Sequence, residues 1–286
     1  MYSILLPYSG SEDEAGAVSL AAQLVTRVAG RADALFLSKT LLPVSGQEQE
    51  GFDHIRAKEG LATANRFLEE FYRNQHKARA AAAHKAYELV LARVETQDRF
   101  TWQEQPDVFQ EAEMLLRNAA FLHDLTLCSF ALTSALLDAV IEDVLLATGR
   151  PVLFAAKQAK GTADLTAVIA WKAVPPTIRA MTAALPLLRT ATKCHVVGIV
   201  EGERPNGPTA AEIAGYLAAS GIAAEAHTLT ADTRSPQTVL ESFCENVRAD
   251  VLVMGAYSQS RLKQFIFGGF TKHFLTNRSC NVLMTA

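Results

Sequence analysis

The residues best suited to bind a ligand lie in a glycine-containing segment near the end of the chain. Three glycines, Gly255, Gly268 and Gly269, stand between an apolar run and a helical pattern. A glycine has no Cβ, so its backbone N–H can approach a phosphate oxygen closely, and the N-terminus of a following helix adds partial positive charge. The segment therefore predicts a phosphate site, in which Ser258 and Thr271 supply hydroxyl donors.

Basic side chains within the same segment include Arg261 and Lys263. If a triphosphate binds here, we expect Arg261 or Lys263 to make a charge-assisted contact with it. The competing interpretation is that the glycines serve an ordinary strand-to-helix turn and that the basic side chains face solvent. The sequence leaves both interpretations open.

Other catalytic and metal-binding patterns are missing from the sequence. The seven histidines form no H-x3-H or H-E-x-x-H pair, so local spacing predicts no metal site, although one assembled from distant residues stays open. There is no G-x4-G-K-(S/T) loop and no G-x-S-x-G elbow. The pairs Ser9/Glu12 and Ser11/Glu14 have the spacing of helix-capping boxes, which is a commoner role than a catalytic serine. We expect no dedicated enzyme, and any ATP hydrolysis would be slow and incidental.

Composition and charge restrict the class of protein. The chain has 286 residues, 49% hydrophobic and 20% charged, with a formal net charge of -3 and a pI of about 6.2. Such a balance predicts no basic surface for nucleic acid or for an anionic membrane. The apolar stretch 130–147 contains three acidic residues, which makes a membrane span too costly, and the first residues show no export signal. The four cysteines form no C-x-x-C pair, so we expect them to be reduced and buried in a cytoplasmic protein.

A degenerate internal repeat runs through the chain, with short apolar runs that alternate with helical patterns. Such continuous apolar runs predict strands of a parallel sheet that is covered on both faces. In the first half we expect strands at 4–9, 34–37, 100–102, 124–129 and 150–154, and in the second half at 168–172, 196–200, 223–229, 250–255 and 280–284. The predicted fold class is α/β, with two tandem doubly wound domains of Rossmann-like or flavodoxin-like type, each built on a five-stranded parallel sheet.

We expect the two domains to span residues 1–158 and 159–286, with a polar linker near 156–164. The first half is the longer one because residues 52–97, rich in Ala, Lys, Arg and Glu, carry apolar residues at helical spacing and predict extra helices. The last strand of each half would lie at a sheet edge, where unpaired backbone groups seek a partner.

The glycine-containing segment resembles the G-x2-G-x9-G-(S/T) motif of nucleotide-binding universal stress proteins. Gly255 and Gly268 match the motif, Ser258 replaces its second glycine, and Gly269 stands where Ser or Thr is usual. The apolar runs 250–254 and 280–284 also look like this family. Together with the repeat, the resemblance covers nearly the whole chain and suggests the tandem two-domain type.

The resemblance implies a nucleotide site in the C-terminal domain, with ATP and Mg²⁺ as the candidate ligand and cofactor. The candidate contacts are Lys172, Ala173, Val200, Met254, Gly255, Ser258, Arg261, Gly268, Gly269 and Thr271. Both halves lack the family's aspartate after the first strand, and Lys172 stands in its place in the second half. The N-terminal domain is expected to be a degenerate copy, because residues 129–134 contain no glycine.

In the family, the last strands pair between domains, so the resemblance also implies an intramolecular pseudo-dimer, while a homodimer stays open. The leading interpretation is a cytoplasmic universal stress protein that acts as a binding or regulatory module in the stress response. One alternative is a member that binds no nucleotide and acts through protein partners or another small ligand in the N-terminal domain. A second is an adenine-nucleotide hydrolase-like α/β enzyme.

Overall fold

The computed structural model describes most of the chain. The described residues are 1–11, 14–38, 47–107, 109, 111–130, 134–157, 164–200, 207–231, 233–256, 269–276 and 278–286. The first half contains β1 (Ser3–Tyr8), α1 (Ala15–Arg27), β2 (Arg31–Phe36), α2 (Gln47–Glu59), α3 (Leu61–Leu91), η2 (Gln97–Arg99), β3 (Phe100–Glu104), α4 (Ala112–Phe121), β4 (Leu125–Cys128), α5 (Ser134–Ala139), η3 (Val140–Leu146) and β5 (Val152–Phe154). The second half contains β6 (Thr166–Trp171), α6 (Pro175–Leu188), β7 (Lys193–Val200), α7 (Ala210–Ala219), β8 (Glu225–Thr230), α8 (Pro236–Asn246), β9 (Val251–Gly255), α9 (Gly269–Thr276) and β10 (Asn281–Thr285).

Each strand expected from the sequence is present, close to its predicted bounds. The central strands are continuous apolar runs because both of their faces are covered, and every residue of β1, β4 and β10 is buried. The outer strands β3 and β8 are more polar and keep several exposed residues. Their composition therefore fits their positions at the two edges of the sheet.

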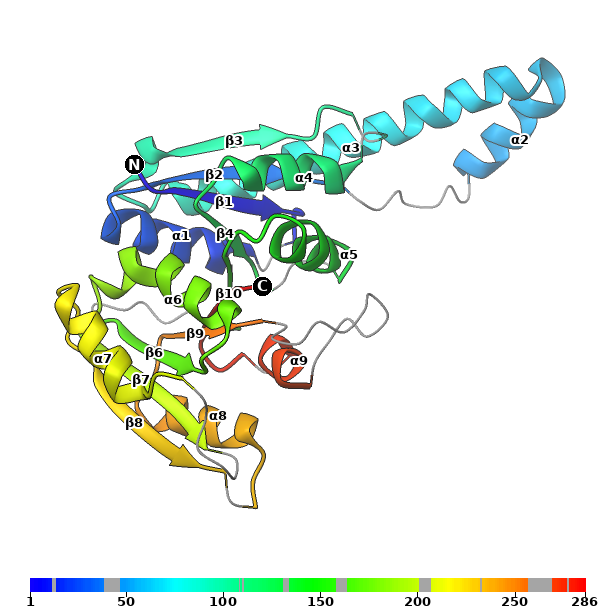
Figure 1. The fold of residues 1–286 in the computed structure, drawn as a ribbon. Coiled ribbons are helices and arrows are strands. Elements are labelled where there is room, and N and C mark those ends of the chain that lie inside the picture. The colour runs from blue at the N-terminus through cyan, green and yellow to red at the C-terminus, as the bar shows by residue number, and fades with distance from the viewer. Residues whose placement is uncertain are drawn as a thin grey trace.

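The ten strands form one sheet in the order β3-β2-β1-β4-β5-β10-β9-β6-β7-β8 (Figure 1). Each half has the doubly wound order in which its first strand lies between its second and its fourth, and all pairs within a half are parallel. The halves meet where β10 pairs antiparallel with β5, with Leu283 opposite Leu153. This pairing confirms the expected joining of the two last strands. The proposed boundary between residues 158 and 159 lies outside the described residues.

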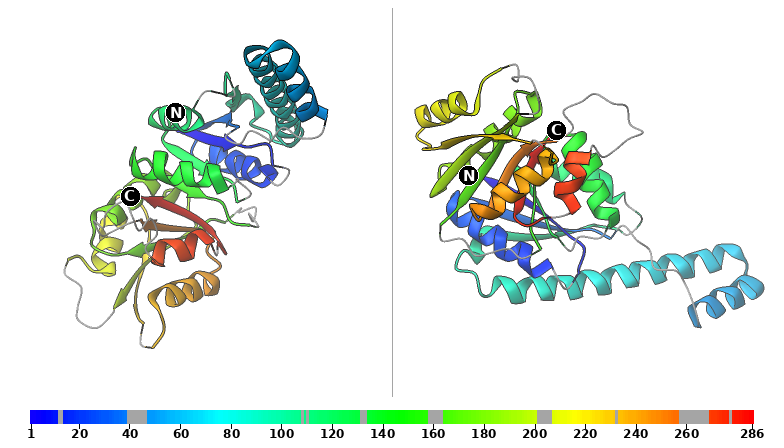
Figure 2. Two further views of the ribbon diagram at one scale, coloured as in Figure 1. Left: turned by 90° about the vertical axis from the view of Figure 1, so that its right-hand side faces the viewer. Right: turned by 90° about the horizontal axis from the view of Figure 1, so that it is seen from below.

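Helices cover both faces of the sheet (Figure 2). One core lies between the sheet and helices α1, α3, α6 and α7. The second core lies on the opposite face, under α4, η3, α8 and α9. On the first face, residues of α1 and α6 line a cavity of about 20 Å³ at the junction of the halves, together with Leu153 of β5. The two repeats therefore share one continuous core on each side.

The extra segment of the first half is helical, as its sequence predicts. α3 has 31 residues, and its C-terminal part packs Ala80, Ala83 and Tyr87 into the core of the first half. Its N-terminal part runs outward from the body with α2 folded back against it (Figures 1 and 2). None of the helices in the described ranges combines the length and apolarity needed to cross a membrane.

The junction strands should contribute strongly to stability. Leu283 on β10 is 1% exposed, so Leu283→Ala leaves a cavity in the shared core and should lower the free energy of unfolding by about 2–5 kcal/mol. Leu89→Ala is the matched control, because Leu89 is 62% exposed and its truncation should change stability by no more than about 0.5 kcal/mol. Urea unfolding followed by circular dichroism measures both. Equal losses for the two variants would contradict this account of the junction.

The four cysteines are unbridged and buried, as expected. Burial raises the pKa of Cys128 to about 12 and that of Cys194 to about 11, so neither forms the reactive thiolate at pH 8. A thiol assay with a chromogenic disulfide should detect less than about one thiol per folded chain and all four after denaturation. Rapid reaction of two or more thiols in the folded protein would show that the core opens more readily than the packing indicates.

Candidate functional site

The strand order places one potential ligand crevice in each half of the molecule. In a doubly wound sheet, ligands bind beyond the carboxyl ends of the strands, at the point where the strand order reverses. In this chain those points lie between β1 and β4 and between β6 and β9. The residues that follow these four strands are therefore the ones to examine as candidate sites, as far as the structure describes them.

In the second half, five of the predicted contacts meet at the carboxyl edge of the sheet. Lys172 and Ala173 follow β6, Val200 ends β7, and Met254 and Gly255 end β9. The strands are neighbours, since β6 pairs with both β7 and β9. Lys172 is exposed, Ala173 and Val200 are half-buried, and Met254 is buried. Lys172 thus places a cationic side chain beside the reversal point, where the family has an aspartate.

Gly255 has a structural reason to be glycine. A Cβ at this position would lie 2.5 Å from the backbone N of Thr177 and 2.9 Å from the Cβ of Pro176. The first turn of α6 therefore packs directly on the end of β9, and any side chain at 255 would force the two apart. This contact supports the strand-to-helix interpretation for Gly255, because it accounts for the residue without any ligand.

The first turn of α6 offers little to an anion. Pro175 and Pro176 have no backbone N–H. The next two N–H groups, of Thr177 and Ile178, both donate to the carbonyl oxygen of Val174, at 3.1 and 3.3 Å. The free donors that make a helix N-terminus attractive to phosphate are thus used up or missing here. The exposed ammonium of Lys172 is the cationic group that the described part of this crevice presents to a bound anion.

The start of α9 carries no described obstruction. Gly269 is exposed, and among the described residues a Cβ built on it would meet nothing within 4 Å. Thr271 is 4% exposed, so its side chain lies against the protein interior. The remaining predicted contacts, Ser258, Arg261 and Gly268, lie outside the described residues.

In the first half, the crevice is occupied by a side chain of the protein itself. The fully buried carboxylate of Glu14 accepts the backbone N–H groups of Ser9, at 3.0 Å, Gly10, at 3.0 Å, and Ser11, at 3.2 Å. It also accepts the Ser9 hydroxyl at 2.7 Å. Three convergent N–H groups and a hydroxyl form the kind of cradle that binds an anion. Here Glu14 fills that cradle.

The Glu14 contacts explain the serine–glutamate spacing in the sequence. The carboxylate bonds back to the N–H of Ser11, as in one half of a capping box, and then reaches further, to Gly10 and Ser9. Burial raises the pKa of Glu14, and the hydrogen bonds from Ser9, Gly10 and Ser11 oppose that rise. The sequence indicated the cap but not that Glu14 closes a ligand site. The second predicted box includes Glu12, which lies outside the described residues.

The extra helix α3 covers the same crevice. Gly10 has a φ of +80°, and a Cβ there would lie 3.1 Å from the Cβ of Ala83 on α3. Aromatic side chains fill the space over the ends of β1, β2 and β3. These are Tyr8, Phe36, His76, His84, Tyr87 and Trp102, in ring contacts of 4.9 to 6.5 Å. The first crevice is therefore closed both by a carboxylate and by a packed aromatic cluster.

A residue of the second half also reaches the first crevice. Arg278 is 8% exposed, and its guanidinium lies 4.5 Å from the ring centre of Phe130 and 6.0 Å from that of Phe154. Burial lowers the pKa of Arg278, and the nearby Cys128 acts in the opposite direction. The sequence carried no signal for this contact, since it joins positions that become neighbours only when β5 and β10 pair.

Comparisons with known proteins agree with this architecture. The model of the universal stress protein family matches residues 146–286. A universal stress protein from Archaeoglobus fulgidus is similar over 98% of this chain and 97% of its own, with 14% identity and a TM-score of 0.69. A putative universal stress protein from Pseudomonas aeruginosa covers 99% of this chain and 92% of its own, with 12% identity and a TM-score of 0.55. No curated protein sequence matches the chain. At such identities the structural likeness concerns the fold alone.

The role of Glu14 can be tested by an isosteric change. In Glu14→Gln, an amide NH₂ would face backbone N–H donors, so the free energy of unfolding should fall by about 1–3 kcal/mol. Glu88→Gln is the control, because the Glu88 side chain is exposed and its Oε1 lies as far as 3.7 Å from Nε2 of His84 on the same helix. Chemical denaturation at pH 7 measures both variants. If Glu14→Gln is as stable as Glu88→Gln, the hydrogen bonds of the Glu14 carboxylate do not stabilise this loop.

Proposed function

Because the chain belongs to the universal stress protein family, we propose that it is a regulatory binding module whose second half binds ATP with Mg²⁺ and whose first half binds no nucleotide. The observation that carries this proposal is the difference between the two crevices. The second keeps an exposed lysine at the reversal point and an open helix start, whereas the first is filled by Glu14 and covered by α3.

The second crevice has the parts that a polyphosphate would need. Lys172 supplies a mobile positive charge at the end of β6, and Gly269 begins α9 with no side chain to obstruct a phosphate. We assign the remaining phosphate contacts to Ser258, Arg261 and Gly268, and to the backbone rather than the buried side chain of Thr271. We assign the contacts with the rest of the nucleotide to Ala173, Val200, Met254 and Gly255. Mg²⁺ would be held chiefly by phosphate oxygens and water, as is usual for this ion.

Charge argues against nucleotide in the first crevice. The backbone donors that could receive a phosphate already hold the Glu14 carboxylate. A phosphate would have to displace a negative group from its hydrogen bonds, or lie beside it and be repelled. We therefore assign the first half a structural or interaction role.

A second candidate function follows from the shape of the first half. The N-terminal part of α3 and the whole of α2 extend away from the body (Figure 1). Only two of the five buried residues of α3, Ala64 and His76, precede residue 80. An extended helical hairpin with few buried residues offers a large surface to a binding partner. This surface favours the alternative in which the protein binds no nucleotide and acts through a protein partner.

The test is to identify small molecules released from the gently purified protein by mass spectrometry and then to titrate Mg-ATP calorimetrically. Wild type should bind one ATP per chain, and Gly268→Val should abolish binding. Lys172→Ala should weaken it about tenfold, the value of one charge-assisted contact. Lys193→Ala is the matched control, because Lys193 begins β7 at the opposite edge of the sheet.

Absence of both nucleotide and titration heat would reject nucleotide binding and favour the partner-binding function. Equal affinity of Lys172→Ala and Lys193→Ala would remove Lys172 from the site. Phosphate release that continues over many turnovers would instead favour the hydrolase-like alternative.

A further inference from the structure

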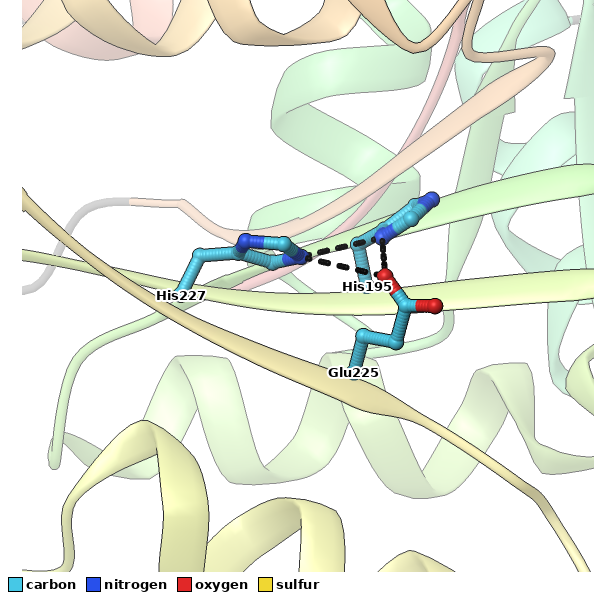
Figure 3. A group of neighbouring side chains, drawn as sticks. All are labelled: His195, Glu225 and His227. Atoms are coloured by element: carbon cyan, nitrogen blue, oxygen red, sulfur yellow. Dashed lines mark hydrogen bonds and ion pairs between the residues drawn. The ribbon is translucent and has the colours of Figure 1, made fainter.

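Two histidines and a glutamate meet near the outer edge of the second half, away from both crevices (Figure 3). His195 lies on β7, and Glu225 and His227 lie on the edge strand β8. The two strands are parallel, with His195 directly opposite Glu225. Residues two apart on a strand point to the same face, so the register brings all three side chains together.

The three side chains present their donor atoms to one another. His195 Nδ1 lies 3.1 Å from His227 Nε2 and 3.5 Å from Glu225 Oε2, and His227 Nε2 lies 3.8 Å from the same oxygen. A point equidistant from the three atoms would be about 2 Å from each, which agrees with zinc–nitrogen and zinc–oxygen bonds of about 2.0–2.2 Å. The arrangement already has the dimensions of a metal site.

We propose that His195, Glu225 and His227 bind one divalent transition-metal ion, for which Zn²⁺ is the appropriate probe. Two imidazole nitrogens and one carboxylate oxygen form a donor set that suits Zn²⁺ and related ions, whereas Mg²⁺ and Ca²⁺ prefer sites made entirely of oxygen. Three protein ligands leave at least one position for water or a further ligand.

The surroundings fix the two rings and leave one side open. Phe243 on α8 packs against both imidazoles, with ring centres 5.8 Å from His195 and 4.8 Å from His227. The His195 side chain is 9% exposed, that of His227 is 29% and that of Glu225 is 76%. The metal would therefore enter from the Glu225 side, where water has access.

The site would fasten the edge strand to the sheet. Among the described residues, β8 has a neighbouring strand only on the β7 side, and its own residues are mostly exposed or half-buried. A metal held by one residue of β7 and two of β8 adds a cross-link between the two strands. His195 and Glu225 lie toward the amino ends of their strands, so the cross-link is at the opposite end of the sheet from the proposed nucleotide crevice. The two proposals can therefore fail separately.

The test is calorimetric titration of Zn²⁺ into the full chain, with bound metal counted by mass spectrometry of the elements after dialysis. Wild type should retain one Zn²⁺ per chain. His227→Gln should weaken binding at least a hundredfold, and Glu225→Gln at least tenfold. The matched control is His273→Gln, since His273 is a partly exposed histidine paired with Glu241 at 3.0 Å but has no third donor beside it among the described residues.

Two further measurements separate binding from damage to the fold. At one hundred times its dissociation constant, Zn²⁺ should raise the Tm of wild type by about 5 °C and leave His227→Gln unchanged. In the presence of a chelator, all variants should have the circular dichroism of wild type. If His227→Gln proves misfolded, Glu225→Gln decides, because its side chain is exposed and replaceable.

Retention of less than one Zn²⁺ in ten wild-type chains, or equal affinity of His227→Gln and His273→Gln, would overturn the proposal. Mg-ATP titration of His227→Gln is the control for damage to the rest of the protein. Because the metal cluster and the proposed nucleotide crevice lie at opposite ends of the sheet, the affinity for Mg-ATP should equal that of wild type.

Discussion

The antiparallel pairing of β5 with β10 is the interaction on which the rest of the structure depends. Each half ends in a strand that, in a separate domain, would expose a row of unpaired N–H and C=O groups. Pairing Leu153 with Leu283 satisfies both rows at once and merges two sheets into one. Residues of α1 and α6 line one small cavity at this junction, and Arg278 of the second half lies over the ring of Phe130 in the first. The two cores on the faces of the sheet are therefore continuous across the junction.

The two copies of the repeat use the same topology for different purposes. In the first, the backbone cradle after β1 holds Glu14, and α3 lies across the strand ends, so the position that could bind a ligand is used for internal stability. In the second, Pro175 and Pro176 remove two backbone donors at the start of α6, and Lys172 is exposed at the strand end. The two halves thus share the topology of the sheet and differ in the segments at its carboxyl edge and in the extra helices of the first half. Loops tolerate such change because few buried contacts depend on them.

The fold was predictable from the sequence to a greater degree than the site. The central strands were predicted because a strand covered on both faces must be an uninterrupted apolar run, which one sequence displays directly. The edge strands β3 and β8 are more polar and were expected as the third strand of each half. Gly255 shows the limit, since a glycine required by a neighbouring helix looks the same as one required by a phosphate. Glu14 was recognised as a cap, but neither its complete burial nor its hydrogen bonds to the N–H groups of Ser9 and Gly10 could be read from the spacing. The cluster of His195, Glu225 and His227 was not predicted, because only the metal-ligand spacings typical of helices were considered. Glu225 and His227 lie two residues apart on a predicted strand. Only the β7–β8 register brings the third to them.

The length of α3 affects how the molecule moves in solution. At 1.5 Å per residue, its 31 residues extend about 46 Å. A compact chain of 286 residues has a radius of gyration of only about 19 Å. The C-terminal part of α3 lies on the body, but its N-terminal part, with α2 beside it, projects in one direction. This projection sweeps a larger volume as the molecule tumbles, so friction with the solvent exceeds that of a sphere of 31.0 kDa. A single chain will therefore elute from a sizing column ahead of its mass, in the range where a compact particle would be taken for a larger assembly.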